Sequence, residues 1–151
     1  MSQRRFSLVV WVMVLAFLVG GIAASAVQAQ TVDEAKTKVE EMPEDPARHY
    51  NLGVVYYKYD KYNDAIASFQ EAVNLKEDYK EAYYNMGLAQ QKVNQHNAAI
   101  KSLKSATDHD KSYADAFAAL GNSYRKKGQN TAAARAYSSA IKIVPNKADW
   151  H

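Results

Sequence analysis

The sequence predicts an all-α fold, an α-solenoid in which three helical hairpins follow one another along the chain after one further helix. Three observations carry this prediction. A 34-residue pattern occurs three times without insertion or deletion. Each copy holds two stretches whose apolar residues recur at steps of three and four, which is the period of an α-helix. The 151-residue chain has only three Pro and six Gly, too few for a low-complexity chain.

Residues 1–29 have the layout of a secretory signal peptide. Arg4 and Arg5 precede an apolar run over residues 8–19, and small residues then lead to a candidate cleavage site after Ala29. The sequence therefore predicts that the first 29 residues are a targeting segment and not part of the fold.

Two alternatives stay open at this end of the chain. Cleavage after Ala26 also satisfies the small-residue rule. An uncleaved anchor is possible too, because residues 8–26 are just long enough to span a bilayer, which would place the chain at an inner membrane. Either way, we expect residues 30–151 outside the cytoplasm, in a periplasm, at a cell surface or in the medium, since positive flanks stay inside.

Residues 30–45 are expected to form an amino-terminal cap helix. Four apolar residues at helical spacing would form one stripe before a proline. The stripe consists of Val32, Ala35, Val39 and Met42.

The three copies of the repeat cover residues 46–79, 80–113 and 114–147, followed by a short tail over residues 148–151. Small and apolar residues return at fixed positions, which is typical of solenoid proteins. The matching sets are Leu52-Gly53, Met86-Gly87 and Leu120-Gly121; Ala65, Ala99 and Ala133; Phe69, Leu103 and Tyr137; Ala72, Ala106 and Ala140; and Tyr56 with Tyr124.

Each copy is expected to form two helices joined by a tight turn. The turn falls at Asp60-Lys61 in the first copy, at Asn94 in the second and at Gly128 in the third. Asn and Gly both tolerate a positive φ, as a tight helix end requires. In the first copy the apolar residues are Tyr50, Leu52, Val55, Tyr56 and Tyr59, then Ala65, Ile66, Phe69, Ala72, Val73 and Leu75.

The small residues of the pattern predict a close approach of the two helices within each hairpin. A bulky side chain at Gly53, Gly87 or Gly121 would wedge the helices apart. The large residues Phe69, Leu103 and Tyr137 are expected to fill the space between successive hairpins. Because one hairpin cannot bury its own apolar face, stability must come from stacking about three of them.

The motif Leu52-Gly53-x-x-Tyr56, followed by Ala65, Phe69 and Ala72, resembles the tetratricopeptide repeat, as do the matching sets in the other copies. The resemblance covers 102 of the 122 residues from 30 to 151. It implies a right-handed superhelix that binds proteins or peptides and needs no cofactor.

No catalytic or metal-binding arrangement is evident in the sequence. It has no Cys, which excludes disulfides, thiolate zinc sites and a cysteine nucleophile. Phosphate-binding, serine-hydrolase and zinc-protease motifs are absent. Asp108-His109-Asp110 cannot converge on a metal, because neighbouring helical residues point about 100° apart. Residues 30–151 carry 17 Lys and Arg against 16 Asp and Glu, which gives no general attraction for nucleic acid.

The resemblance also implies where a partner would bind. In this family the first helices of the hairpins line the concave side, and ligands usually bind there. The corresponding residues are Tyr50, Asn51, Val54, Tyr57 and Lys58 in the first copy, Tyr84, Asn85, Leu88, Gln91 and Lys92 in the second, and Ala118, Asn122, Arg125 and Lys126 in the third. Aromatic side chains beside amides and cations suit a peptide with apolar and acidic groups. The alternative is that these are ordinary repeat residues without a selected ligand.

One specific partner is not expected. Repeat domains that bind the acidic tails of cytosolic chaperones use a basic and amide clamp, whose positions fall on Tyr50, Val54, Asn85, Asp115 and Ala119. Only Asn85 fits that clamp, and Asp115 would repel a carboxylate.

Self-association is the alternative function. Residues 30–78 carry 6 Lys and Arg against 11 Asp and Glu, a net charge of −5, whereas residues 79–151 carry 11 against 5, a net of +6. Opposite charges at the two ends favour a head-to-tail homo-oligomer. The repeats stop at Lys147, so the last hairpin would lack a solvating end helix and could stack on another copy. A membrane contact is expected only through an uncleaved amino-terminal segment.

Overall fold

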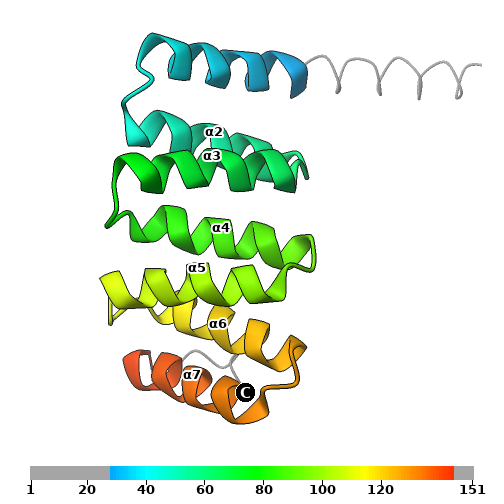
Figure 1. Ribbon diagram of the computed structural model, residues 1–151, viewed down its shortest axis with the longest axis vertical. Coiled ribbons are helices and arrows are strands. Elements are labelled where there is room, and N and C mark those ends of the chain that lie inside the picture. Colours follow the sequence, from blue (N-terminus) through cyan, green and yellow to red (C-terminus); the bar gives the residue numbers. More distant parts are fainter. Residues whose placement is uncertain (1–27, 145–151) are drawn as a thin grey trace, which may run out of the picture. The chain divides into compact units, whose positions relative to one another are not determined.

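The computed structural model describes residues 28–144 of the chain (Figure 1). All regular structure in this range is helical. Contacts divide the chain after Glu34 into two compact units. Residues 28–41 are helical, and Val32 within this stretch is buried. The expected targeting segment and the tail over residues 148–151 lie outside the described residues.

Six further helices follow, and equivalent helices begin 34 residues apart. They are α2 (Pro46–Lys58), α3 (Tyr62–Leu75), α4 (Lys80–Lys92), α5 (His96–His109), α6 (Ala114–Lys126) and α7 (Asn130–Ile143). The odd-numbered helices have 14 residues and the even-numbered ones have 13. This regular succession confirms the predicted all-α helical repeat solenoid.

The helices pack as hairpins that stack in chain order (Figure 1). Within hairpins, α2 packs on α3, α4 on α5 and α6 on α7; between hairpins, α3 packs on α4 and α5 on α6. The buried residues form two clusters, and each draws on more than one hairpin. Stability therefore depends on nearest-neighbour stacking, as expected for a repeat protein.

Each hairpin turns at a residue with positive φ. The φ angle is 59° at Asp60, 59° at Asn94 and 71° at Gly128, which confirms the turn predicted at these positions. In the first turn the Lys61 N–H donates to the Tyr56 carbonyl at 3.0 Å, and equivalent bonds close the other two turns. Such bonds satisfy carbonyls that a helix end leaves unpaired.

The repeated glycines lie directly against the large residue of their own hairpin. A Cβ added to Gly53 would lie 2.6 Å from Phe69 Cε1, and one added to Gly87 would lie 2.6 Å from Leu103 Cγ. Real Cβ atoms do not approach other heavy atoms this closely. The predicted close approach of the two helices is therefore confirmed, and the large side chain fills the place that a glycine leaves.

Phe69 and Leu103 also join successive hairpins, as predicted. Both are fully buried, and Phe69 shares a cluster with Met86 of the next hairpin. Tyr137 differs because it belongs to the last hairpin. Its hydroxyl donates to Asn122 Oδ1 at 2.8 Å, within the same hairpin.

The first described helix is shorter at its carboxyl end than the segment expected to form it. The helix ends at residue 41, and Met42 is 49% exposed, so this residue does not continue the apolar stripe. A residue before a proline is disfavoured in the helical conformation, and Pro43 follows directly. Asp45 then caps α2 by accepting a 2.9 Å hydrogen bond from the Ala47 N–H.

No helix between residues 28 and 144 is long and apolar enough to cross a membrane. The candidate anchor over residues 8–26 lies outside that range.

Candidate functional site

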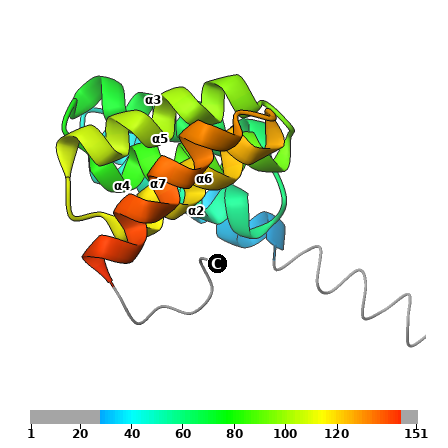
Figure 2. The same cartoon turned by 90° about the horizontal axis from the view of Figure 1, so that it is seen from below.

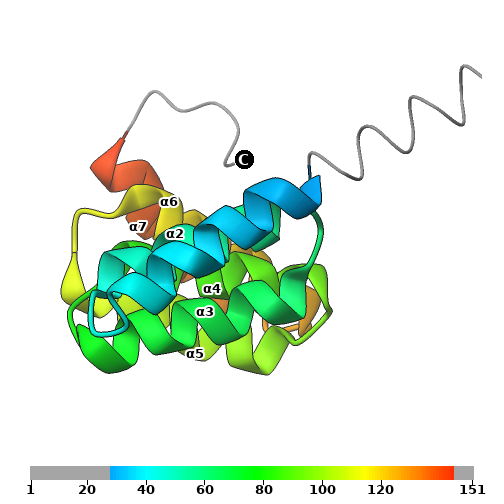
Figure 3. The ribbon, with the colours of Figure 1, turned by 90° about the horizontal axis from the view of Figure 1, so that it is seen from above.

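The side of the stack formed by α2, α4 and α6 is called here the inner face. α2 contacts α4 and α4 contacts α6, whereas no comparable contact joins α3 to α5 or α5 to α7 within the described part of the chain. Views along the stack show α3 and α5 on one side and α2 and α6 on the other (Figures 2 and 3).

Two tyrosine pairs lie at the inner face in the same register. The ring centroids of Tyr50 and Tyr79 are 5.1 Å apart, and those of Tyr84 and Tyr113 are 5.0 Å apart. Each pair joins the first helix of one hairpin to the residue that precedes the first helix of the next. The pairs therefore fix the position of adjacent hairpins at this face.

Burial raises the pKa of Tyr50, Tyr79, Tyr84 and Tyr113 above the ordinary value of a phenol. The hydrogen bond from Asn85 opposes part of this effect at Tyr50. All four phenols are consequently neutral at physiological pH. They offer aromatic surface and hydroxyl groups, without negative charge, to a partner.

Helical spacing in the sequence did not identify Tyr79 and Tyr113 as components of this face. Both precede a helix, where a helical pattern does not extend. They are nevertheless 34 residues apart, so their return at one repeat position was the available signal.

Two of the predicted binding residues connect neighbouring hairpins. Asn85 Nδ2 donates a 2.8 Å hydrogen bond to the Tyr50 hydroxyl oxygen. Gln91 Nε2 lies 2.8 Å from the Ala119 carbonyl oxygen and 2.7 Å from Ser123 Oγ. These hydrogen bonds join neighbouring hairpins at the inner face. The two amide groups therefore have fewer free donors for hydrogen bonds to a partner.

Other predicted residues are partly or fully withdrawn from the surface. Tyr57 is half-buried and packs edge-on against Tyr62, with centroids 5.3 Å apart. Tyr84 and Leu88 pack against the second buried cluster. Ala118 is only 7% exposed, so it contributes almost no surface.

The remaining predicted residues are exposed and define the accessible part of the inner face. Val54 is a large hydrophobic residue with 41% exposure. The polar and charged members are Asn51, Lys58, Lys92, Asn122, Arg125 and Lys126. An exposed apolar residue among amides and cations is a composition suited to a mixed apolar and acidic segment.

The three lysines of this exposed set also have a role in the helices themselves. Lys58, Lys92 and Lys126 are the last residues of α2, α4 and α6. A cation at a helix carboxyl end interacts favourably with the helix dipole. These lysines therefore stabilise their helices whether or not a ligand is bound.

An ion pair links the two ends of the second hairpin. Lys80 Nζ lies 2.7 Å from Asp110 Oδ2 and 5.9 Å from the centroid of the Tyr113 ring. The Lys80 ammonium, with hydrogen bonds from Ser112, lowers the pKa of the Asp110 carboxyl to about 2. The Asp110 carboxylate therefore makes a structural contact and is ionised at any ordinary pH.

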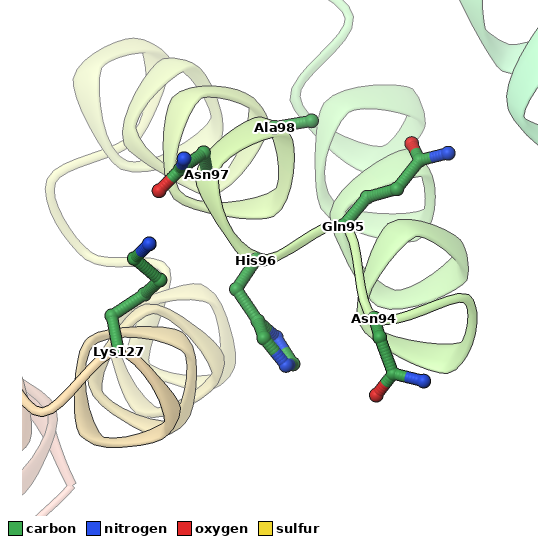
Figure 4. A pocket seen from close by; sticks show the side chains of 6 residues that line it. All are labelled: Asn94, Gln95, His96, Asn97, Ala98 and Lys127. Carbon is green, nitrogen blue, oxygen red and sulfur yellow. The ribbon is translucent and has the colours of Figure 1, made fainter.

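A broad hollow of about 410 Å³ lies beside the turn of the second hairpin (Figure 4). The ring of His96 lies between Asn94 and Lys127 in this view, and its buried Nδ1 has no hydrogen-bond partner among residues 28–144. The lining residues are Asn94, Gln95, His96, Asn97, Ala98 and Lys127. One imidazole without a nearby carboxylate in this lining gives hydrogen-bonding capacity but no acid–base pair.

No group of three or more His, Asp or Glu side chains that could hold a metal ion is present in the described range. His109 of the Asp108-His109-Asp110 sequence stacks on Tyr83 instead, with ring centroids 5.6 Å apart.

Comparison with known families agrees with the repeat geometry. A family model described as TPR repeat matches residues 56–94 and 121–151, and a model described as tetratricopeptide repeat matches residues 80–113. Together these matches cover more than half of the chain. A search of curated proteins by sequence finds no match.

Solved structures show the same fold. The crystal structure of MamA is 32% identical, with a TM-score of 0.73, over 76% of this chain and 67% of that one. YrrB, described as a TPR protein with an unusual peptide-binding site, is 25% identical, with a TM-score of 0.73, over 83% of this chain and 64% of that one. MamA from Desulfovibrio magneticus RS-1 is 21% identical, with a TM-score of 0.76, over 82% and 70%.

Three in-phase helical hairpins with a glycine-based close contact define a helical repeat protein. The chain belongs to the tetratricopeptide repeat family. It is therefore a protein-interaction scaffold whose partners are proteins or peptides.

Proposed function

We propose that this protein is a non-catalytic scaffold that binds a peptide or protein segment along its inner face, outside the cytoplasm. The observation that carries the proposal is the exposed set around Val54 on the face where the first helices of the hairpins come together. The tyrosine pairs and the hydrogen bond from Asn85 to Tyr50 hold in place the helices that carry this exposed set. Such a preorganised face loses little conformational freedom when it binds.

The chemistry of the face selects a class of segment. Val54 with the half-buried tyrosine rings offers apolar contact, while Lys58, Lys92 and Arg125 offer positive charge. An extended or helical segment that carries apolar and acidic side chains complements both features. YrrB, with its peptide-binding site, gives this proposal a precedent on the same fold.

A direct test uses peptides selected from a displayed random library against the wild-type protein. We expect the selected peptides to be acidic and to bind about tenfold or more weakly to a Val54→Glu/Lys92→Glu double variant, because the change buries a carboxylate and reverses a charge. The matched control is Ala67→Glu/Lys104→Glu on exposed positions of α3 and α5. Equal loss of binding in both variants, or in neither, would exclude the inner face.

The location outside the cytoplasm rests on the layout of residues 1–29. Expression of the full chain followed by cell fractionation and intact-mass measurement tests it. We expect a mature chain that begins at Gln30 or Val27 in an extracytoplasmic fraction. A full-length chain in the membrane fraction would support the anchor, and a full-length chain in the cytosol would refute export.

Head-to-tail self-association is the second candidate, favoured by the net charges of −5 and +6 on residues 30–78 and 79–151. Electrostatic contacts of this kind weaken as salt screens them. We expect light scattering at high protein concentration to show larger particles at low salt than at high salt. A monomer at both salt concentrations would remove this candidate.

A further inference from the structure

One repeat position differs in the middle hairpin. Tyr56 and Tyr124 occupy the same position in the first and third repeats, and both rings pack against buried clusters. In the second repeat this position holds Gln90. The middle hairpin therefore lacks an aromatic ring that its two neighbours have.

A hollow of about 340 Å³ lies where Gln90 replaces the ring. Its floor and walls come from α4 and α5, with one residue from α3. The lining residues are Gln70, Tyr83, Met86, Gln90, Ala98, Lys101, Ser102 and Ser105. This volume is at the lower end of the range for ligand pockets, about 300–1,000 Å³, and suits a single side chain.

The floor of the hollow is polar. Gln90 is 7% exposed and Ser102 is 5% exposed, and Ser102 Oγ donates a 2.8 Å hydrogen bond to Gln90 Oε1. Gln90 lines the hollow, and its Nε2 is not among the fully buried atoms without a hydrogen-bond partner in the described range, so this nitrogen is open to the hollow. The amide N–H groups of Gln90 can therefore donate to an acceptor that enters the hollow.

The walls determine the shape of the group that carries this acceptor. Tyr83 and Met86 provide aromatic and thioether surface, which packs well against a ring. The first and third repeats place a tyrosine ring at the same position. A phenol therefore satisfies both features, since its ring fills the space and its hydroxyl oxygen accepts from Gln90 Nε2.

We propose that the hollow around Gln90 is a second binding site, which receives a tyrosine side chain of a protein partner. It is separate from the inner face because Tyr83, Met86 and Gln90 lie at steps of three and four along α4, whereas Tyr84 and Leu88 follow a different stripe. A partner can therefore occupy the hollow and the inner face at the same time, from two sides of the same helix.

The test uses 4-methylphenol, the analogue of a tyrosine side chain, with ¹⁵N-labelled full-length protein. We expect saturable chemical-shift changes at the Gln90 side-chain amide and at the backbone amides of Ala98 and Ser102, with millimolar affinity because the ligand is small. Toluene should bind several-fold more weakly, since it has no acceptor. Acetate tests whether Lys101 makes this an anion site and should cause no shifts there.

Two variants fill the hollow from different helices. Gln90→Tyr restores the residue of the other repeats and should raise the melting temperature while it abolishes the 4-methylphenol shifts. Ala98→Leu fills the space from α5 and should also abolish them, which keeps the test decisive if one variant fails to fold. Ala134→Tyr adds a ring at an exposed position of α7 and should leave the shifts unchanged.

Three results would overturn the proposal. The first is an absence of shifts at Gln90 and Ser102 up to the solubility limit of 4-methylphenol. The second is persistence of those shifts in both folded filling variants. The third is a response to acetate or toluene as strong as the response to the phenol.

Discussion

Asn85 of the second hairpin donates a 2.8 Å hydrogen bond to the hydroxyl oxygen of Tyr50 in the first hairpin. The same tyrosine packs against Phe69, with ring centroids 5.8 Å apart, and against Tyr79. A residue assigned to ligand binding from its repeat position is therefore also part of the joint between two hairpins. Binding and stacking share the same side chains at the inner face.

Removal of the Tyr50 hydroxyl should weaken that joint. We expect Tyr50→Phe to lower the free energy of unfolding by about 0.5–1.5 kcal/mol, because the Asn85 amide loses a half-buried acceptor. Urea unfolding measures this change. In a double-mutant cycle with Asn85→Ala the two losses should not add, and strictly additive losses would show that the hydrogen bond contributes nothing.

The contact between Gly53 and Phe69 leads to a second prediction. Gly53→Ala should destabilise the protein by about 1–3 kcal/mol, because a Cβ at this position would lie 2.6 Å from a buried ring. This loss is expected even though alanine is the better helix former by about 1 kcal/mol. Phe69→Leu should recover part of the loss in the double variant. A stabilising Gly53→Ala change, measured by thermal unfolding, would contradict the close contact.

The turns allow a test that involves no packing. Gly128 has a φ of 71°, and an added Cβ would meet no atom within 4 Å. Gly128→Ala should still lower the free energy of unfolding by about 1 kcal/mol, because a left-handed backbone strains a residue with a Cβ. Gly128→Asn introduces the residue type found at the second turn and should lower the free energy of unfolding by less. Equal stability of all three proteins in urea would argue against the left-handed turn.

The Lys80–Asp110 pair predicts a pH dependence. The folded pKa of Asp110 is about 2, below its ordinary value of 3.8, so the carboxylate stabilises the fold above the unfolded pKa. That contribution is lost as the pH falls from about 4 through 2. Asp110→Asn should therefore be less stable than wild type at pH 6 and should approach it near pH 2. Glu77→Gln is the control at an exposed position, and a stability gap for Asp110→Asn that is constant with pH would refute the pairing.

The sequence was sufficient to predict the parts of the fold that local sterics dictate. The repeated glycines predicted the approach of paired helices, and Asn94 and Gly128 predicted the turns, because few residues tolerate those conformations. The position of each hairpin relative to the next could not be predicted in this way. Gln91 reaches Ala119 and Ser123 across that boundary, and only the stacking geometry shows that its amide is engaged.

The candidate site was predicted in part for the same reason. Repeat position identified the helices of the inner face, yet it did not separate exposed residues such as Val54 from the buried Ala118. Tyr113 was not predicted to be part of the site, because it precedes a helix and so does not belong to a set of residues at helical spacing. Side-chain exposure in a repeat protein depends on its neighbours in the stack, which spacing along one helix does not describe.

The most direct measurement of the central claim locates a bound peptide by paramagnetic relaxation. Because the chain has no Cys, Ala47→Cys and Ala67→Cys each allow one nitroxide label at an exposed position, on α2 and α3 respectively, without changing a residue of the proposed site. With a library-selected peptide bound, we predict strong broadening of the peptide resonances by the label at position 47 and little broadening by the label at position 67. Strong broadening from position 67, with little from position 47, would contradict binding at the inner face.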